Sequence, residues 1–511
     1  MHTLLGYAWL EERFCLESVQ PLPVSSSAGG SRVTRDDGIT RHEIWPQRYH
    51  PEDTIAGHLS FAFRNEGIFL EQLVRLYSID EVKIALEGWI NREPTGVYAR
   101  RAGFLYEWLT GGSLNVADLT QGNYADALPL DQFFTGDGKR NRRWRIRDNL
   151  PGTPAFCPMV RRTSAVVEAE GLNMEEALEE LEHDYGADLV RRSCVWLTIK
   201  ESRASFLIEH EQKQEDRIRR FAAVMERECG REPDPLAFEY LQKLQADILG
   251  PNALVYGIRR SPVYVGHTAG YEPVVDYIAP SWQHVPEMLH GLSRLLGRTA
   301  SQSSLLRAAV VSFAFVYVHP MSDGNGRISR FLINDVLRRD GVISSPLILP
   351  VSATITDSTR QRADYDHALE SFSRPLMQTY ADKWRFGETE IAPDGREYNL
   401  HFDAYDEALP AWRYPDLTSH VAYLHRVLEQ TIRHEMRKEA DTLKANDQAR
   451  REIKEVLEAP DMELDTIIRS ITQNGFQLSN KLIKRYPLLA ENSRFGTRIV
   501  EIIKNAFKSE E

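Results

Sequence analysis

The sequence is poor in cysteine and has no long apolar run. It contains four cysteines, and no two of them form a CxxC pair. This pattern argues against a disulfide framework or a cysteine zinc site and favours a reducing compartment. The longest apolar stretch, Ala308 to Val318, is broken by Ser312 and is shorter than the ~20 residues that span a bilayer. The first residues also lack the features of a signal peptide, so we expect a soluble, cytoplasmic protein.

Positive charge is scarce as well. The 511 residues include 62 lysines and arginines against 74 aspartates and glutamates, which gives a formal net charge of −12. This balance disfavours general binding to nucleic acid or to a membrane surface, although it allows a local basic patch. The length corresponds to roughly three domains, and the hydrophobic fraction is typical of globular proteins.

Helical periodicity dominates the chain and predicts a mainly α protein in three parts. Residues 1–160 are mostly helical, with a flexible loop at about 21–53 where proline, glycine and serine cluster. Residues 161–376 contain an apolar, buried helix at Leu305 to Val318 and a β-hairpin at about 262–280. Residues 377–511 are irregular directly after Pro375 and helical again from Leu417.

A segment rich in chemically useful residues, HPMSDGNGRISR, follows the buried helix at residues 319–330. Pro320 disfavours a helical conformation at His319, so the helix ends there and presents the imidazole. Gly324 and Gly326 let the main chain curl, and their N–H groups can converge on an anion in front of the next helix.

The same segment carries charged side chains for phosphate chemistry. Asp323 is a hard oxygen ligand suited to Mg²⁺, which commonly binds one carboxylate together with phosphate oxygens and waters. Arg327 and Arg330 are three residues apart and share one face of the next helix. A base, a metal carboxylate, a glycine-rich anion site and two arginines predict phosphoryl or nucleotidyl transfer.

This segment resembles the signature HPFx(D/E)GNGRxxR of Fic-domain proteins, which transfer AMP from ATP to hydroxyl side chains of proteins. Met321 replaces the usual phenylalanine, and an apolar residue of similar size should anchor the loop equally well. Residues 262–280 are similar to the family's flap, and residues 363–369 to a helix that helps hold the adenine. The resemblance extends from about Cys194 to Leu376. It implies a Fic-type helical core with a small β-hairpin flap, flanked by helical segments.

The resemblance also implies a role for each matching residue. His319 would be the general base, and Asp323 would hold Mg²⁺. The nucleotide would be bound by Gly324, Asn325, Gly326, Arg327, Arg330 and Tyr365, and the flap would be formed around Val263, Tyr264, Val265 and Gly266. The expected partners are ATP and a hydroxyl-bearing target protein or the chain itself; a homodimer is left open.

A possible inhibitory helix lies near residues 195–212. Ser205 and Glu209 there resemble the family's motif (S/T)xxxE(G/N), whose glutamate pairs with the second arginine of the active motif. The departure is His210, where glycine or asparagine is usual. Glu66, which is followed by glycine but lacks the upstream serine or threonine, is the second candidate.

Two other features support an alternative function. Residues 139–147 contain six basic residues around Trp144, and residues 461–487 are compatible with a helix-turn-helix in which Ser479 caps the second helix. Together they would suit a nucleic-acid-binding regulator with a degenerate Fic core, although we favour ordinary contacts between segments for both. A Fic enzyme that removes AMP, or transfers another phosphate-containing group, is a further alternative.

Overall fold

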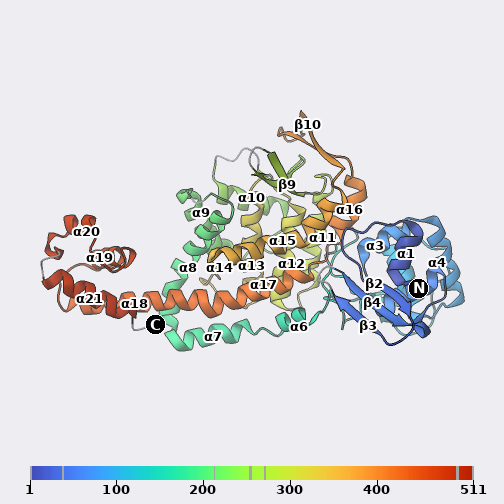
Figure 1. The fold of residues 1–511 in the computed structure, drawn as a ribbon, viewed down its shortest axis with the longest axis horizontal. Helices are drawn as coiled ribbons and strands as arrows, with labels where there is room; N and C mark the ends of the chain where they lie inside the picture. The colour runs from blue at the N-terminus through green and yellow to red at the C-terminus, as the bar shows by residue number, and fades with distance from the viewer. Residues whose placement is uncertain are drawn as a thin grey trace.

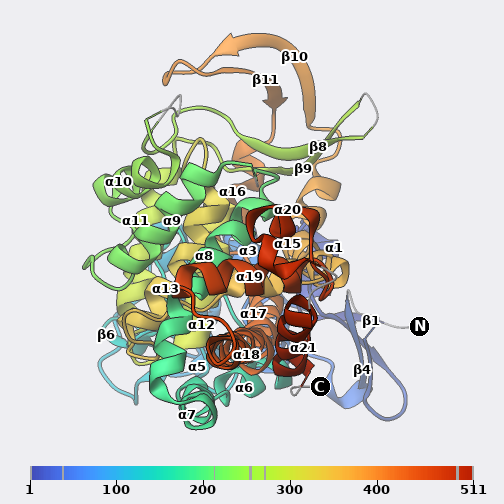
Figure 2. The same cartoon turned by 90° about the vertical axis from the view of Figure 1, so that its left-hand side faces the viewer.

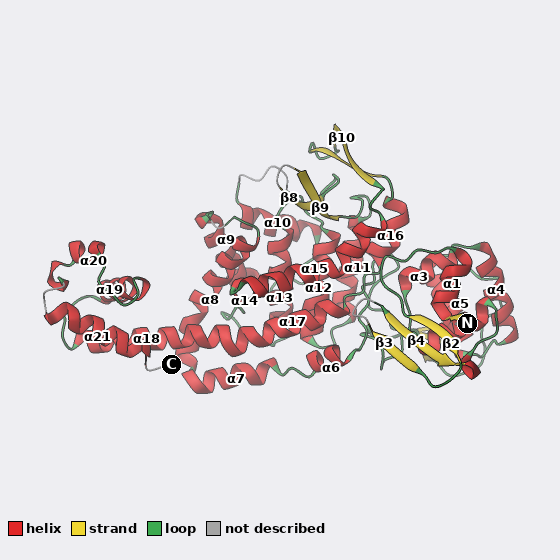
Figure 3. Cartoon of the chain, in the orientation of Figure 1, coloured by secondary structure: helices red, strands yellow, loops and turns green. Residues whose placement is uncertain are grey.

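The structure is a computed structural model that describes residues 3–36, 40–211, 213–251, 256–269, 272–490 and 494–508. Helices make up most of the molecule, and the strands form small, separate sheets (Figure 3). The mainly α fold expected from the sequence is therefore confirmed. None of the helices in these ranges combines the length and the apolar character that crossing a bilayer requires.

The amino-terminal part has its own apolar core and lies at one end of the molecule (Figure 1). Its largest sheet has the order β1-β2-β4-β3, with β1 (Thr3–Leu5), β2 (Val24–Ala28), β3 (Val33–Asp36) and β4 (Arg41–Pro46). The helices of this part are α1 (Gly6–Phe14), α2 (Ile55–Asn65), α3 (Leu70–Tyr77), α4 (Asp80–Arg92) and α5 (Val97–Thr110).

The prediction of a flexible loop at about 21–53 is wrong, because β2, β3 and β4 lie within it. Strand β2 was not predicted because it is rich in serine. Ser25 and Ser27 lie on its buried face, where a half-buried strand usually shows alternating apolar residues.

The basic run at 139–147 lies in a second sheet of β5 (Ala125–Asp126), β6 (Lys139–Asn141) and β7 (Ile146–Asp148). Arg143 Nε lies 3.1 Å from Glu107 Oε1, and Arg147 Nε lies 2.6 Å from Asp126 Oδ1. Trp144 is buried. The run therefore joins neighbouring segments of the amino-terminal part, which is the interpretation that the sequence favoured.

Helix α12 (Ser304–Val318) is the centre of the middle part and is almost entirely buried, as predicted. The hairpin predicted at 262–280 is β8 (Tyr264–Ala269) with β9 (Glu272–Ile278); residues 270 and 271 of its turn lie outside the described residues. The surrounding helices are α6 (Ser164–Glu170), α7 (Met174–Tyr185), α8 (Ala187–Ile208), α9 (Glu215–Glu228), α10 (Phe238–Leu249), α11 (Val285–Arg298), α13 (Asn325–Arg339), α14 (Val351–Thr356) and α15 (Thr359–Thr379).

The chain does not become irregular directly after Pro375, contrary to expectation, because α15 continues through this proline. Phe372 and Leu376 on its buried face hold the helix despite the lost hydrogen bond. A second hairpin follows, formed by β10 (Trp384–Ile391) and β11 (Glu397–Phe402). It stands beyond the β8–β9 hairpin (Figure 2). The sequence concealed it because most side chains of β10 are exposed.

The carboxy-terminal part is helical from α16 (Tyr405–Arg413) and α17 (Thr418–Gln430) onward. A π-helical turn (Thr431–Met436) leads into α18 (Arg437–Lys454). The last helices, α19 (Asp461–Gln473), α20 (Asn480–Arg485) and α21 (Arg494–Lys508), pack with the end of α18 around a separate apolar cluster. Ser479 caps α20 as predicted, since its hydroxyl accepts from the Leu482 N–H at 3.2 Å.

Candidate active site

The candidate active site is centred on the loop between α12 and α13. Helix α12 ends at His319, whose φ of 48° is left-handed, and Pro320 follows it. Helix α13 begins after Gly324, whose φ of 88° is one that side-chain-bearing residues rarely adopt. The motif therefore places the imidazole on the loop that leads to the positive, amino-terminal end of α13.

Within the described residues, one ring nitrogen of His319 makes a hydrogen bond and the other makes none. Its Nδ1 lies 3.2 Å from the carbonyl oxygen of Val316. Because a carbonyl oxygen can only accept, Nδ1 carries the proton and Nε2 keeps its lone pair. Burial, followed by the charge of Arg259, lowers the pKa of His319 to about 4. The imidazole is therefore neutral at physiological pH and can accept a proton at Nε2.

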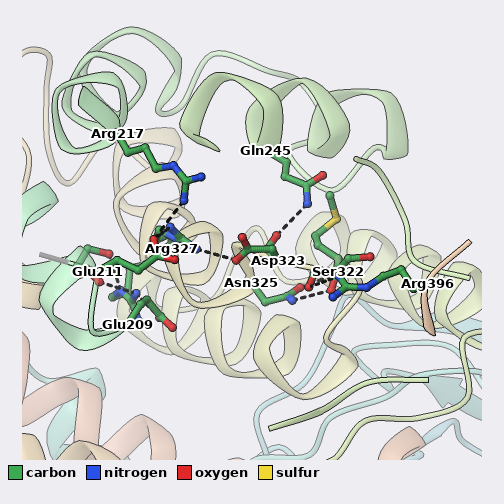
Figure 4. A network of polar contacts seen from close by, with 12 residues as sticks. Glu209, Glu211, Arg217, Gln245, Ser322, Asp323, Asn325, Arg327 and Arg396 are labelled. Atoms are coloured by element: carbon green, nitrogen blue, oxygen red, sulfur yellow. Dashed lines mark hydrogen bonds and ion pairs between the residues drawn. The ribbon is translucent and has the colours of Figure 1, made fainter. Parts of the chain in front are cut away.

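Side chains from distant elements hold the main chain of this loop (Figure 4). The Arg396 guanidinium, from the turn between β10 and β11, donates to the Ser322 carbonyl oxygen at 3.3 Å. The Gln245 amide, from α10, donates to the Asp323 carbonyl oxygen at 2.9 Å. The conformation of the loop thus depends on two elements that the motif does not contain.

The loop also stabilises itself. Met321 is fully buried, as expected of an apolar anchor. Its N–H and carbonyl groups both bond to the Asn325 side chain, at 2.9 and 2.8 Å. With further bonds from Arg259 and Ile328, every carbonyl of residues 318–324 accepts a hydrogen bond. The Asn325 amide is thus engaged through its oxygen and through one of its two N–H donors, which fixes the orientation of this side chain.

Arg330 is buried and contacts both residues of the motif on α8. Its Nε donates to Ser205 Oγ at 2.7 Å, and its Nη2 lies 2.6 Å from Glu209 Oε1. Burial works to raise the pKa of Glu209, but the guanidinium outweighs it and holds this pKa below its usual value. The structure therefore brings Glu209 to Arg330, as expected from the sequence, and adds Ser205 as a second partner of this arginine.

The Glu209 carboxylate occupies the space in front of Gly326. A Cβ atom at this position would lie 2.1 Å from Glu209 Oε1, so a glycine is required for the approach. Arg330 Nη1 would lie 3.2 Å from the same Cβ and makes no hydrogen bond within the described part of the chain. A carboxylate thus lies at the amino terminus of α13, where an anionic ligand is favoured.

Arg327 bridges two other carboxylates (Figure 4). Its Nη2 lies 2.7 Å from Asp323 Oδ1, and its Nη1 lies 2.7 Å from Glu211 Oε2. Arg217 Nη1 lies 3.5 Å from the same Glu211 oxygen. Sequence reasoning missed Glu211 because it lies outside the SxxxE pattern, although its place two residues after Glu209 is a signal in retrospect.

The second candidate for an inhibitory residue, Glu66, lies elsewhere. Its carboxylate accepts from the Tyr7 N–H at 2.9 Å, at the start of α1. Figure 1 places α1 in the amino-terminal part at one end of the molecule, whereas α8 lies in the middle part. Burial raises the pKa of Glu66 to about 8. The structure therefore does not bring Glu66 close to Arg327 or Arg330.

The predicted flap is anchored beside the loop of residues 319–324, which is named the catalytic loop for its predicted role. Val263 precedes β8, and its carbonyl accepts from the Ala279 N–H at 3.1 Å; Tyr264, Val265 and Gly266 lie in the strand. The Tyr277 hydroxyl of β9 donates to the carbonyl of Tyr317, near the end of α12. The base of the hairpin is thus fixed two residues before His319.

Tyr365 lies in α15 and is buried close to Arg330. Burial raises the pKa of this tyrosine, and the charge of the Arg330 guanidinium opposes the increase. The side chain expected to contact the adenine therefore lies at the same arginine as Ser205 and Glu209.

A magnesium ion fits this site only together with a nucleotide. No group of three or more His, Cys, Asp or Glu side chains in the described ranges is arranged to hold a metal ion. The Asp323 side chain is 47% exposed, and one of its oxygens already faces Arg327. One accessible carboxylate suits Mg²⁺ that is also bound by phosphate oxygens and waters.

Residues 235–337 match the model of the Fic/DOC family, so the chain contains a Fic domain, and the loop described above belongs to it. Protein adenylyltransferase fic-1 of Caenorhabditis elegans is 31% identical over 123 residues, which are 24% of this chain and 22% of that protein. Protein adenylyltransferase Fic of Drosophila ananassae is 31% identical over 130 residues, with the same two shares. The matched region is thus less than a quarter of each relative. A Fic family protein from Desulfovibrio desulfuricans G20 aligns over 62% of this chain and 90% of its own, at 18% identity and a TM-score too low, at 0.38, to add to the assignment.

Proposed function

We propose that the protein is a Fic-type adenylyltransferase that transfers AMP from ATP to a hydroxyl side chain of a target protein or of itself. The observation that carries this proposal is the contact of His319 Nδ1 with the Val316 carbonyl, which leaves Nε2 available as a base on the loop that leads to the amino terminus of α13 and Arg330. The similarity of the Fic domain to protein adenylyltransferases supports the choice of AMP as the transferred group.

In the proposed reaction, Nε2 of His319 takes the proton of the acceptor hydroxyl. The hydroxyl oxygen forms a bond to the α-phosphorus of ATP, the bond to the β-phosphate oxygen breaks, and pyrophosphate leaves. Mg²⁺, which Asp323 would hold, would neutralise phosphate charge. Phosphates would bind the main chain of residues 324–326 together with Arg327 and Arg330, while Tyr365 packs near the adenine. Residues 263–266 of the flap would align the acceptor segment by strand addition.

We further propose that Glu209 and Ser205 inhibit the enzyme. The γ-phosphate of ATP and the Glu209 carboxylate would compete for the same guanidinium. The 2.6 Å contact between Glu209 and Arg330 supports this, because the carboxylate already neutralises the guanidinium and would repel a phosphate beside it.

The test is incubation of wild type, Glu209→Gly and Glu209→Gly/His319→Ala with Mg²⁺ and ATP labelled on the α-phosphate, followed by mass spectrometry of the chain. We expect AMP on Glu209→Gly, little on wild type and none on the double variant. If the chain is labelled by CTP, GTP or UTP and not by ATP, the proposed nucleotide donor would be wrong. A DNA gel shift without any transfer would support the nucleic-acid-binding alternative.

We also propose a cytoplasmic location. All four cysteines are free thiols in the structure, and three of them are buried, which suits a reducing compartment. Cell fractionation checks this.

A further inference from the structure

Arg259 is a fully buried arginine that directly precedes the flap region and contacts the catalytic loop. Its Nε donates to the carbonyl oxygen of His319 at 2.6 Å, and its Nη2 approaches that of Val318 at 3.4 Å. Its main-chain N–H donates to the carbonyl of Pro320 at 2.9 Å. One residue thus holds three successive carbonyls at the point where α12 ends and the catalytic loop begins.

The same guanidinium also holds both ends of the β8–β9 hairpin. Nη1 donates to the carbonyl of Ser261, which precedes β8, at 2.9 Å. Nη2 donates to the carbonyl of Pro280, which follows β9, at 2.6 Å. The fork geometry of arginine allows these bonds together with the bond to His319, whereas a lysine ammonium has a single donor centre.

Stabilisation of the helix end alone does not explain this arrangement. A cation near the last carbonyls of α12 is favourable, but an exposed lysine or arginine would supply that interaction. Arg259 is instead buried, and its side-chain hydrogen bonds in the described part of the chain all go to main-chain carbonyls. Burial of a charge without an ion-pair partner is costly, so the hydrogen bonds to the helix end and to the hairpin are what compensate it.

We propose that Arg259 is a positioning residue that fixes the flap and His319 as one unit, so that an acceptor segment on the flap presents its hydroxyl to Nε2. This inference rests on the proposed transferase function. It predicts that loss of Arg259 slows the transfer step and loosens the hairpin, while the nucleotide site, built around Arg327 and Arg330, still binds ATP.

Arg307 provides a matched control. It is also buried, it lies in the first turn of the same helix α12, and its Nη2 also donates to a main-chain carbonyl, that of Leu296, at 3.0 Å. It touches neither the flap nor the catalytic loop through any of its hydrogen bonds. Arg307 also pairs with Asp340, so Arg307→Gln should destabilise the fold at least as much as Arg259→Gln, but without effects on the flap or on His319.

The experiment places Arg259→Gln, Arg259→Lys and Arg307→Gln in the Glu209→Gly background and measures melting temperature, ATP binding, and kcat and KM for self-modification. We expect kcat to fall by about a hundredfold in Arg259→Gln with KM for ATP little changed, partial recovery in Arg259→Lys, and no specific loss in Arg307→Gln. Equal losses in Arg259→Gln and Arg307→Gln, or unchanged kcat in a folded Arg259→Gln, would overturn the proposal.

Hydrogen exchange in the chain without the Glu209 change tests the same idea independently of activity. Amides of residues 264–269 and 272–278 should exchange faster in Arg259→Gln than in Arg307→Gln. If the Glu209→Gly protein transfers no AMP, the proposed function fails, yet this measurement still shows whether Arg259 holds the hairpin. Unchanged exchange of the hairpin would contradict its positioning role.

Discussion

Two glutamates at the ends of helices show how differently one residue type behaves in this molecule. Glu209 follows α8 and faces Arg330, which lowers its pKa, whereas Glu66 follows α2 and is buried against the start of α1, which raises its pKa to about 8. Glu209 is therefore an anion at neutral pH, and Glu66 is largely protonated. A short motif that contains glutamate thus does not define an inhibitory residue. The group that faces the carboxylate determines whether the glutamate is charged.

The largest expected effect comes from a substitution at Glu209. Glu209→Gly should increase AMP transfer by roughly ten- to over a hundredfold, because a charge-assisted bond contributes about 1.5–3 kcal/mol. Glu209→Gln, which keeps the size but removes the charge, should activate less. Initial rates at fixed ATP measure both. Arg330→Ala should not imitate the activation, since it removes the phosphate partner as well, and activation by Arg330→Ala would contradict this assignment of roles.

The second expected effect concerns stability and pH near Glu66. Its pKa rises on folding from the usual 4.5 to about 8, so its contribution is fully present below pH 4.5 and is lost as the pH rises toward 8. Hydrogen exchange of α1 and β2 should report a decrease of up to about 1.4 kcal/mol per pH unit in wild type. Glu66→Gln, which imitates the protonated form, should remove this slope. The Glu209 contribution has the opposite sign, since it is lost only as the pH falls below 4.5.

A smaller effect should come from Glu211, the partner of Arg327. Its side chain is 32% exposed, so solvent weakens this ion pair, and Glu211→Gln should raise transfer by on the order of two- to fivefold. The matched control is Glu215→Gln, because Glu215 also pairs with arginines but lies at the surface. Equal rates of AMP transfer for wild type and Glu211→Gln would mean that Glu211 does not contribute to inhibition.

The smallest expected effect on the rate of AMP transfer comes from Glu66. Glu66→Gln should leave the rate of AMP transfer unchanged, because the carboxylate lies in the amino-terminal core and bonds to the start of α1. The rates are compared with and without Glu209→Gly. An activating Glu66→Gln would show that the amino-terminal part acts on the catalytic loop.

The sequence allowed prediction of those parts of the site that are contiguous. The spacing of His319, Asp323 and Arg330 followed from one segment, and the end of α12 followed from Pro320. The contacts of Arg259, Gln245 and Arg396 could not be predicted, because each acts through a main-chain carbonyl that has no signature in the sequence. Helix α12 was foreseen because nearly all of its residues are apolar. Strand β2 was missed because its buried face carries serines, and β10 because it is mostly exposed.

The hydrogen-bonded carbonyls of the catalytic loop have a consequence for the order in which ligands bind. Each carbonyl of residues 318–324 already accepts a hydrogen bond, and one Asp323 oxygen already faces Arg327. A hydrated Mg²⁺ ion that arrives alone would find a single uncommitted carboxylate oxygen, beside a guanidinium that repels it. If the protein binds Mg²⁺ and ATP as proposed, affinity for the metal should come mainly from the triphosphate. We therefore expect the ion and the nucleotide to bind as one ligand, with strong positive coupling in a calorimetric titration.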